Sequence, residues 1–365
     1  MGRTILAALV VLAISACSTG GSPSAGGSAS AEPSASPDPS TDPSASPVPT
    51  SAVPPGEHPA TGLAFVQFPG GSDDPASQIF VVQSDGSLLQ VTGQAGGSIG
   101  ASRPMWSPDR TQIAFGPPKV GFPGVTGQVS VVNADGTGER VMSEGENPRW
   151  SPDGTRLLVS EVDDVTSEPR SMWIVDVATG ELTDLGQGFN PAWLPDGQRI
   201  SFRRMVETSD GSFADAIYLT TLASGETEEF GTESESDVFW APDGSSVLIH
   251  HDGSLTLAEP DGSGSEPLVS GFEPAWSPDS TRIVFAYDFD ENATPILALV
   301  DLDGQTLWSG PLGTSATWSP DGTRIAVEIP FPQPMVQVLD ASTGDTLWEM
   351  EGSSDPNWSS PVLAP

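Results

Sequence analysis

The sequence is organised around a ten-residue stretch that recurs along most of its length. Its best-formed copy begins at Trp150 and reads Trp-Ser-Pro-Asp-Gly-Thr-Arg-Leu-Leu-Val. Pro152 fixes φ at the second position of a tight turn, Asp153 tolerates the third position, and Gly154 supplies a positive φ. The apolar run that follows is typical of a strand buried in a stack of sheets. Each copy therefore predicts a β-hairpin.

Copies of this stretch recur at a regular interval. Six carry the turn, and a seventh, Pro356-Asn357-Trp358-Ser359, repeats only the strand end. The tryptophans are Trp106, Trp150, Trp193, Trp240, Trp276, Trp318 and Trp358, separated by 44, 43, 47, 36, 42 and 40 residues. Each interval also holds a second apolar strand followed by a Gly turn, as at Asp135-Gly136 and Thr179-Gly180. Two hairpins in a period of about 40 to 45 residues are the pattern of one four-stranded propeller blade.

The pattern resembles the TolB-type, WD40-like β-propeller repeat, whose Trp-Ser-Pro-Asp-Gly signature is nearly intact in this chain. The resemblance covers residues 61–365. Arg110 and Ser280 stand at the Gly position of the signature, and Leu194 and Ala241 stand at the Ser position. We therefore expect these four turns to be altered or strained, without a change in the fold.

The two ends of the repeat region complement each other. Residues 63–92 hold three strands of a first blade but no Trp-bearing inner strand, whereas Trp358 belongs to an inner strand that has no partners. Propellers avoid unpaired sheet edges. We therefore predict an all-β fold, a seven-bladed β-propeller of four-stranded antiparallel blades. The ring is closed by the C-terminal strand completing blade one, with Trp358 packed between blades like the other six tryptophans.

Two segments of different composition precede the propeller. Residues 1–16 contain an apolar run that is shorter than the about 20 residues of a membrane-spanning helix, and it is typical of a secretory signal. The end of this run, Ile14-Ser15-Ala16-Cys17, resembles the lipobox of bacterial lipoproteins, which implies cleavage before Cys17 and lipid attachment to it. The alternative is an ordinary signal peptide with an incidental cysteine. Residues 17–60, rich in Ser, Pro, Ala and Gly, predict a disordered tether, and residues 61–365 form the propeller.

The charge of the chain limits its partners. The sequence has 13 basic and 49 acidic residues, a formal net charge of −36, and almost all of the excess lies within residues 61–365. Such a surface repels nucleic acid and anionic membranes, so we expect no nucleic-acid partner. Solubility or adaptation to high salt is one interpretation of this charge. Attraction of a basic protein segment or of divalent cations is the other.

The sequence assigns no catalytic residue, cofactor or metal site. The loose cluster of Asp288, Asp290 and Glu291 comes nearest to a cation site, but it lacks the spacing of a calcium loop. No Gly-x-Ser-x-Gly nucleophile motif accompanies the repeats, unlike in prolyl-oligopeptidase relatives. The chain has three histidines, fewer than propeller lyases of the oligogalacturonate type require. A carboxylate acting as general base stays open.

Variable loops on a rigid scaffold are where binding residues usually lie. In propellers of this kind the repeat turns occupy one face, and the loops between hairpins and between blades occupy the other. These loops vary in length along the chain and contain aromatic and Arg residues, the usual anchors of interfaces. The residues predicted to contact a partner are Phe122, Arg203, Arg204, Tyr287 and Phe331. The alternative is that these loops are unselected insertions.

These features predict a monomeric, lipid-anchored, extracytoplasmic propeller that binds or scaffolds a protein of the cell envelope or exterior, a basic one being a candidate. The membrane would be reached through the lipid on Cys17. The alternative is a carbohydrate-active or other small-molecule enzyme that uses the central channel. Turnover of a substrate by the isolated propeller would distinguish the two.

Overall fold

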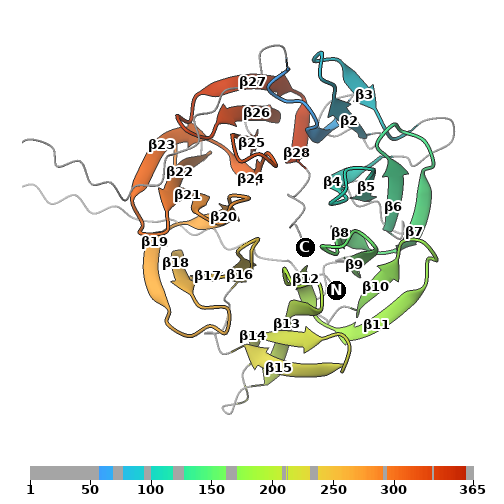
Figure 1. The fold of residues 1–365 in the computed structure, drawn as a ribbon, viewed down its shortest axis with the longest axis vertical. Helices are drawn as coiled ribbons and strands as arrows, with labels where there is room; N and C mark the ends of the chain where they lie inside the picture. Colours follow the sequence, from blue (N-terminus) through green and yellow to red (C-terminus); the bar gives the residue numbers. More distant parts are fainter. Residues whose placement is uncertain are drawn as a thin grey trace, which may run out of the picture. The chain divides into compact units, whose positions relative to one another are not determined.

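A computed structural model describes residues 57–68, 77–93, 100–117, 127–161, 171–207, 211, 213–230, 237–290, 294–330 and 333–358. The predicted signal segment, Cys17 and most of the tether lie outside these ranges. The described residues form seven four-stranded antiparallel sheets set around a central axis, as predicted (Figure 1). No helix long and apolar enough to cross a membrane occurs among them.

Each blade extends from an innermost strand beside the axis to an outermost strand at the rim. From the inside outward, blade one contains β28 (Ser353–Asn357), β1 (Ala64–Gln67), β2 (Gln78–Val82) and β3 (Leu88–Gln90). Blade two contains β4 (Ser102–Trp106), β5 (Gln112–Gly116), β6 (Gln128–Asn133) and β7 (Arg140–Glu144). Blade three contains β8 (Glu146–Trp150), β9 (Arg156–Ser160), β10 (Ser171–Asp176) and β11 (Leu182–Gln187).

The remaining four blades follow in chain order around the ring (Figure 1). Blade four contains β12 (Phe189–Trp193), β13 (Arg199–Glu207), β14 (Phe213–Thr221) and β15 (Glu226–Phe230). Blade five contains β16 (Asp237–Trp240), β17 (Val247–His251), β18 (Ser254–Ala258) and β19 (Glu266–Ser270). Blade six contains β20 (Phe272–Trp276), β21 (Arg282–Phe289), β22 (Pro295–Asp301) and β23 (Thr306–Leu312). Blade seven contains β24 (Thr314–Trp318), β25 (Arg324–Ile329), β26 (Met335–Asp340) and β27 (Thr346–Glu351).

The ring closes in blade one, where the last strand pairs with the first. Strand β28 runs antiparallel to β1, with Ala64 opposite Asn357 and Gln67 opposite Ser353. Trp358 is 4% exposed and packs in one apolar cluster with residues of blade one and blade seven. Its indole Nε1 donates to the Thr61 carbonyl at 3.1 Å. The predicted blade count and the closure by the C-terminal strand are confirmed.

Residues just before the predicted start of the propeller also join this closure. Ala60 is fully buried in the cluster that contains Trp358. The carbonyl of Pro59 accepts a 2.8 Å hydrogen bond from the Arg324 guanidinium of blade seven. The His58 ring meets the edge of Trp348 in the outermost strand of the same blade. Packing against blade seven therefore begins at residue 58.

The core consists of seven apolar clusters, and each joins two consecutive blades. One repeat tryptophan lies in or against each cluster. Four of the indoles donate to the carbonyl of the residue that precedes the tryptophan of the previous blade, for example Trp150 to Met105 at 2.8 Å and Trp193 to Arg149 at 3.0 Å. A large apolar side chain with one polar atom at its edge suits this position, because it fills the gap between two sheets and locks their register.

Arginines that follow the repeat turn also link neighbouring blades. The guanidinium of Arg156 lies 4.8 Å from the ring centroid of Trp193 and donates to the Gly197 carbonyl at 2.9 Å. Arg282 repeats both contacts on Trp318 and Gly322. In blades three and six the Arg of the signature therefore reaches over the tryptophan of the next blade and binds that blade's turn.

The turns themselves are held by a small hydrogen-bond network. Ser151 Oγ, Thr155 N and Thr155 Oγ1 all donate to Asp153 Oδ1, and Arg156 N donates to Ser151 Oγ. Burial alone would raise the pKa of Asp153, but the hydrogen bonds from Ser151 and Thr155 outweigh it and lower the pKa. The aspartate of the signature therefore organises the turn.

The two turns without Gly keep the same geometry. Arg110 has a φ of 61° and Ser280 a φ of 59°, close to the 70° of Gly154. In both turns this residue donates its N–H to the carbonyl of the turn's Ser at 2.9 Å, as Gly154 does. In these two turns the expected alteration is backbone strain at a side-chain-bearing residue. The turns with Leu194 and Ala241 lack the Ser hydroxyl, and Asp196 and Asp243 bind backbone N–H groups of their own turns, as at Gln198 and Ser245.

Candidate functional site: the central channel and the loop face

The two faces of the propeller differ in what they present. The Trp-Ser-Pro-Asp turns and the second-hairpin turns lie on one face, which we call the turn face. The loops between the second and third strands, and the links between blades, lie on the other, the loop face. Each inner strand therefore begins at the loop face and ends at the turn face. The turn face is uniform, since its aspartates are bound within their own turns.

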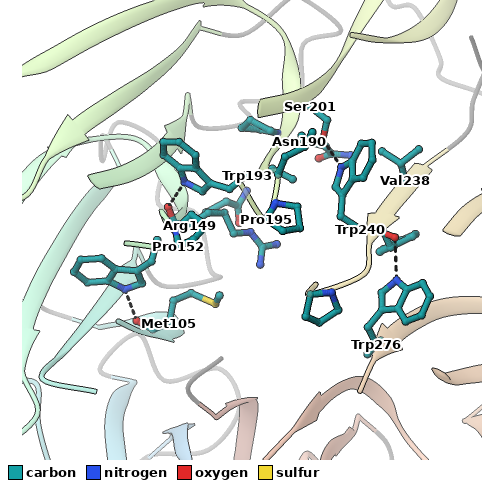
Figure 2. A pocket seen from close by; sticks show the side chains of 18 of the residues that line it. Met105, Arg149, Pro152, Asn190, Trp193, Pro195, Ser201, Val238, Trp240 and Trp276 are labelled. Atoms are coloured by element: carbon teal, nitrogen blue, oxygen red, sulfur yellow. Dashed lines mark hydrogen bonds between the residues drawn. The ribbon is translucent and has the colours of Figure 1, made fainter. Parts of the chain in front are cut away.

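A cavity of about 840 Å³ follows the axis between the inner strands. All seven repeat tryptophans border it, together with five prolines of the repeat turns. Figure 2 shows part of this lining, including Trp193, Trp240 and Trp276. Trp106, Trp150, Trp318 and Trp358 are buried in the clusters between blades. The other three tryptophans pack against such clusters and are partly buried. The side chains that give the channel its chemistry come instead from the residues one and three positions before each tryptophan.

The residues three positions before the tryptophans form a ring at the loop-face end of the channel, which we call the mouth ring. Its members are Arg103, Asn147, Asn190, Asp237, Glu273, Ser315 and Asp355. Six of them have a left-handed φ between 49° and 53°, and Asp237 is the exception. The inner strand bulges beside these six positions, which turns their side chains away from the sheet.

Hydrogen bonds join three of the neighbouring pairs in the mouth ring. Arg103 Nη1 donates to Asn147 Oδ1 at 2.6 Å, and Arg103 N donates to Asp355 Oδ2 at 3.2 Å. Glu273 Oε2 accepts from Ser315 N at 3.3 Å and from Thr314 Oγ1. The sequence reasoning missed this ring. A sequence signal for the ring exists, because five of the seven tryptophans end an x-Pro-x-Trp pattern. The residue before the proline of that pattern is the ring residue.

Arg203 is the predicted contact residue that the structure places at the channel. Its guanidinium forms ion pairs with Asp215 of its own blade and with Asp237 of blade five, the latter at 3.1 Å. It also lies over the Phe189 ring, 5.4 Å from the centroid. Arg203 therefore bridges blades four and five, and both of its acidic partners are within the molecule.

The other predicted contact residues are spread over the loop face or lie outside the described ranges. The Arg204 guanidinium packs over the rings of Phe202 and Tyr218, 5.1 Å from each centroid. Tyr287, near the loop-face end of β21, is 43% exposed. Phe122 and Phe331 fall on residues that the structure does not describe. No contact joins Arg203, Arg204 and Tyr287, the three of these residues that the structure describes.

The acidic cluster considered for a cation is only partly described. Asp288 accepts a 2.8 Å hydrogen bond from Phe289 N, and Asp290 accepts one of 2.7 Å from Thr294 N, whereas Glu291 lies outside the described residues. Across the described ranges, no group of three His, Cys, Asp or Glu side chains is placed to hold a metal ion. The two described carboxylates act as acceptors for the local backbone.

Arg149 lies one position before Trp150, in the innermost strand of blade three, and its side chain is exposed to the channel (Figure 2). Protein surrounds the channel on all sides, and this desolvation lowers the pKa of the Arg149 guanidinium, with a smaller contribution from the charge of Arg103. An arginine remains cationic at any physiological pH despite such a shift. The channel therefore contains a fixed positive charge.

Comparison with known proteins gives a family and a fold. A family model described as the TolB β-propeller domain matches residues 59–313. No curated protein matched. TolB from Acinetobacter baumannii is 17% identical, with a TM-score of 0.49 over 68% of this chain and 64% of that chain.

Two protease structures are also similar. A prolyl endopeptidase is 14% identical, with a TM-score of 0.57 over 80% of this chain and 49% of that chain. The chain thus spans less than two thirds of both that enzyme and the Acinetobacter protein. The propeller domain of the Trilobed protease from Pyrococcus furiosus is 14% identical, with a TM-score of 0.58 over 80% of this chain and 95% of that one. That domain is described as having an open velcro topology. In this chain, by contrast, β28 and β1 share a sheet.

Proposed function

This chain belongs to the TolB β-propeller domain family, and from that premise we propose that it is a lipid-anchored module that binds or scaffolds another protein at the cell envelope. The observation that carries the proposal is the difference between the two faces. The turn face uses its polar side chains internally. The loop face presents Met205, Tyr287 and Phe289, which are half of the exposed large apolar side chains among the described residues.

Tyr287 and Phe289 give this face its aromatic character. Both belong to β21, which extends toward the loop face, and Phe289 is 53% exposed although it stacks on Phe272 with ring centroids 5.2 Å apart. A stacked ring is held in one orientation, so it loses little conformational freedom when a partner binds. Rigid aromatic anchors of this kind often cost more than about 2 kcal/mol of binding energy when truncated.

The partner would be found by crosslinking in the native envelope, followed by identification of captured proteins. Tyr287→Ala and Phe289→Ala should each weaken the captured complex several-fold. Leu182→Ala is the matched control, because Leu182 is equally exposed but lies on β11, the outermost strand of blade three. An equal loss in all three variants, or a loss only in Leu182→Ala, would contradict the assignment of this face.

Phe122→Ala, Arg204→Ala and Phe331→Ala extend the test to the other predicted contacts. Arg203→Ala needs a melting curve beside its binding curve, because it also removes the bridge between blades four and five. Substitutions at Asp153 or Asp321 on the turn face should change stability and leave partner affinity unaltered. If these turn variants weaken binding at unchanged stability, the partner binds the turn face.

The anchoring part of the proposal rests on the sequence before the propeller. Cys17→Ser should remove the acyl mass from the mature N-terminus and release the protein from the membrane fraction. Metabolic labelling with a fatty acid and mass spectrometry of the N-terminal peptide provide the measurement. A wild-type N-terminus without an acyl group would reject the anchor while leaving the binding proposal intact.

The alternative function, a small-molecule enzyme using the channel, has less support. The carboxylate that borders the cavity, Asp237, is ion-paired with Arg203. A general base needs a free, correctly placed acceptor, and this carboxylate is engaged. Incubation of the purified propeller with envelope oligosaccharides tests the alternative. Turnover that is lost in Asp237→Asn would favour it over the binding module.

A further inference from the structure

The channel is electrically different from the rest of the molecule. The protein carries a formal net charge of −36, yet the charged side chains that line the cavity are two arginines and one aspartate, Arg149, Arg203 and Asp237. Two of these three neutralise each other, because Arg203 is paired with Asp237 and with Asp215. Arg149 is left as the uncompensated charge of the lining.

Arg149 has no acidic partner within the part of the chain that the structure describes. Five of the ten described arginines have an acidic partner, for example Arg199 with Asp196 at 2.8 Å and Arg103 with Glu146 at 3.5 Å. Others bind backbone carbonyls or pack on rings, as Arg140 and Arg204 do. No described acceptor receives a hydrogen bond from the Arg149 guanidinium. Its five N–H donors therefore face the channel.

The backbone that carries Arg149 is firmly held. Its carbonyl accepts the indole N–H of Trp193 at 3.0 Å, and its two neighbours, Pro148 and Trp150, are buried. The residue therefore occupies a fixed point between blades three and four, and only the side chain retains freedom. A cation on a rigid strand, with no internal partner, is the arrangement expected of a ligand anchor.

Polar donors flank the same part of the channel. Asn147 and Asn190 belong to the mouth ring of blades three and four, and both line the cavity. The Oδ1 of Asn147 accepts from Arg103, which orients the amide and leaves its NH₂ group to donate. The remaining lining is largely apolar, from proline rings, Val238, Phe239 and the edges of the tryptophans.

We propose that the channel binds a ligand through a carboxylate, with Arg149 as its anchor and an apolar body lying against the proline and tryptophan lining. The planar guanidinium fork matches a carboxylate in a bidentate pair. One uncompensated positive charge in the lining matches the single charge of a monoanion better than the double charge of a phosphate dianion. The cavity, about 840 Å³, is within the range of sites that enclose small ligands.

The carboxylate could belong to a small molecule or to the C-terminus of a peptide. Both present the same group to Arg149, and the test separates them. The inference does not depend on the proposed partner surface, because Tyr287 and Phe289 lie outside the cavity lining. Loss of protein binding in the Tyr287 variant and loss of carboxylate binding in an Arg149 variant are separate results.

Calorimetric titration with three probes tests the site. The probes are an acetylated apolar tripeptide with a free carboxylate, its C-terminal amide, and hippurate as a small carboxylate. The tripeptide acid or hippurate should bind at least about tenfold more tightly than the amide. If the tripeptide acid binds and hippurate does not, the ligand is a peptide C-terminus. If hippurate binds and the tripeptide acid does not, the ligand is a small carboxylate. Equal binding of the acid and the amide would overturn the proposal.

Variants show whether Arg149 is responsible. Arg149→Gln should weaken carboxylate binding by at least about tenfold at an unchanged melting temperature, since the side chain contacts no described partner. Arg149→Lys, which keeps the charge but not the fork, should fall between. Arg110→Gln is the control, because Arg110 is an exposed turn residue whose loss changes the net charge equally. An equal effect of Arg110→Gln and Arg149→Gln would show a general charge effect and reject the site.

The titrations are repeated on a chain that ends at Ser360. Residues 361–365 follow closely after Trp358, which lines the cavity, and this arm measures whether they affect binding. Acid-selective binding that depends on Arg149 in either chain supports the assignment. Failure of both carboxylates to bind at millimolar concentration in both chains would overturn it.

Discussion

Trp358→Ala should destabilise the ring where the two chain ends meet. A buried aromatic side chain covers about 150 to 250 Å², which at about 25 cal/mol per Å² amounts to about 4 to 6 kcal/mol. Partial burial in the unfolded chain reduces this by about 10 to 40%, so about 4 kcal/mol remains, within the range observed when large core residues are truncated. The indole bond to Thr61 adds about 1 kcal/mol.

Differential scanning calorimetry measures the expected change. With an unfolding entropy of about 2.1 cal/mol/K per residue over roughly 300 residues, 4 kcal/mol corresponds to a fall in Tm of about 6 °C. Hydrogen exchange adds the location of the change. Amides of β1 and β2, including Phe65 and Phe80, should lose protection first, because β1 pairs with the strand that Trp358 ends.

Trp318→Ala is the matched control for this experiment. Trp318 is similarly buried and also donates its indole N–H to a carbonyl of the preceding blade, Ala275 at 3.1 Å, but it joins blades that are consecutive in sequence. Its Tm should fall by a similar amount, with the loss of protection in blades six and seven. A Trp358→Ala protein that melts within 1 °C of the wild type, or whose exchange pattern equals that of Trp318→Ala, would refute the closure argument.

Two further predictions concern the tryptophans and the turns. In urea unfolding, Trp106→Phe should lower the free energy of unfolding by about 1 kcal/mol less than Trp150→Phe does. The reason is that Trp106 Nε1 is buried without a described acceptor, whereas Trp150 Nε1 donates to the Met105 carbonyl. Equal losses in the two variants would contradict this. The pKa of Asp153 is lowered in the folded state despite its burial, so its stabilisation is present above the unfolded value near 3.8 and is lost as pH falls through the folded value. Stability should therefore decline below pH 3.8, and less steeply in a Ser151→Ala, Thr155→Val variant that lacks the hydrogen bonds to Asp153; parallel pH profiles would reject this explanation.

Much of the fold could be predicted from the sequence because its signals are local. A Pro-Asp-Gly turn between two apolar strands specifies a hairpin wherever it occurs, and seven tryptophans in register fix the blade count. Even the closure followed from counting strands, since Trp358 lacked partners that residues 63–92 could supply. The TolB-type resemblance implied a propeller as well, and the family match confirms that resemblance.

The channel could not be predicted in the same way. Whether Arg149 faces a neighbouring blade or the axis depends on the bulge in β8 and on the curvature of the closed ring, and neither is a local property. Sequence reasoning selected Arg203 for its charge, but the structure uses that charge between blades four and five. Arg149 carries no local signal of binding, because it lies between Pro148 and Trp150, inside a motif whose pattern indicates a structural role. The contributions of Phe122 and Phe331 stay predictions.

The left-handed backbone of the mouth ring lets residues at the channel entrance vary without a change in the fold. Six of the ring's seven residues lie at bulges, where the strand pairing requires only tolerance of a positive φ; the exception is Asp237, which is ion-paired with Arg203. A left-handed residue with a side chain costs about 1 to 3 kcal/mol, and Asn adopts this conformation more readily than Arg, Glu or Ser. Related propellers could therefore exchange these six residues to suit different ligands without a change in strand pairing, and this chain accepts local strain at Arg103, Glu273 and Ser315 at the entrance to its channel.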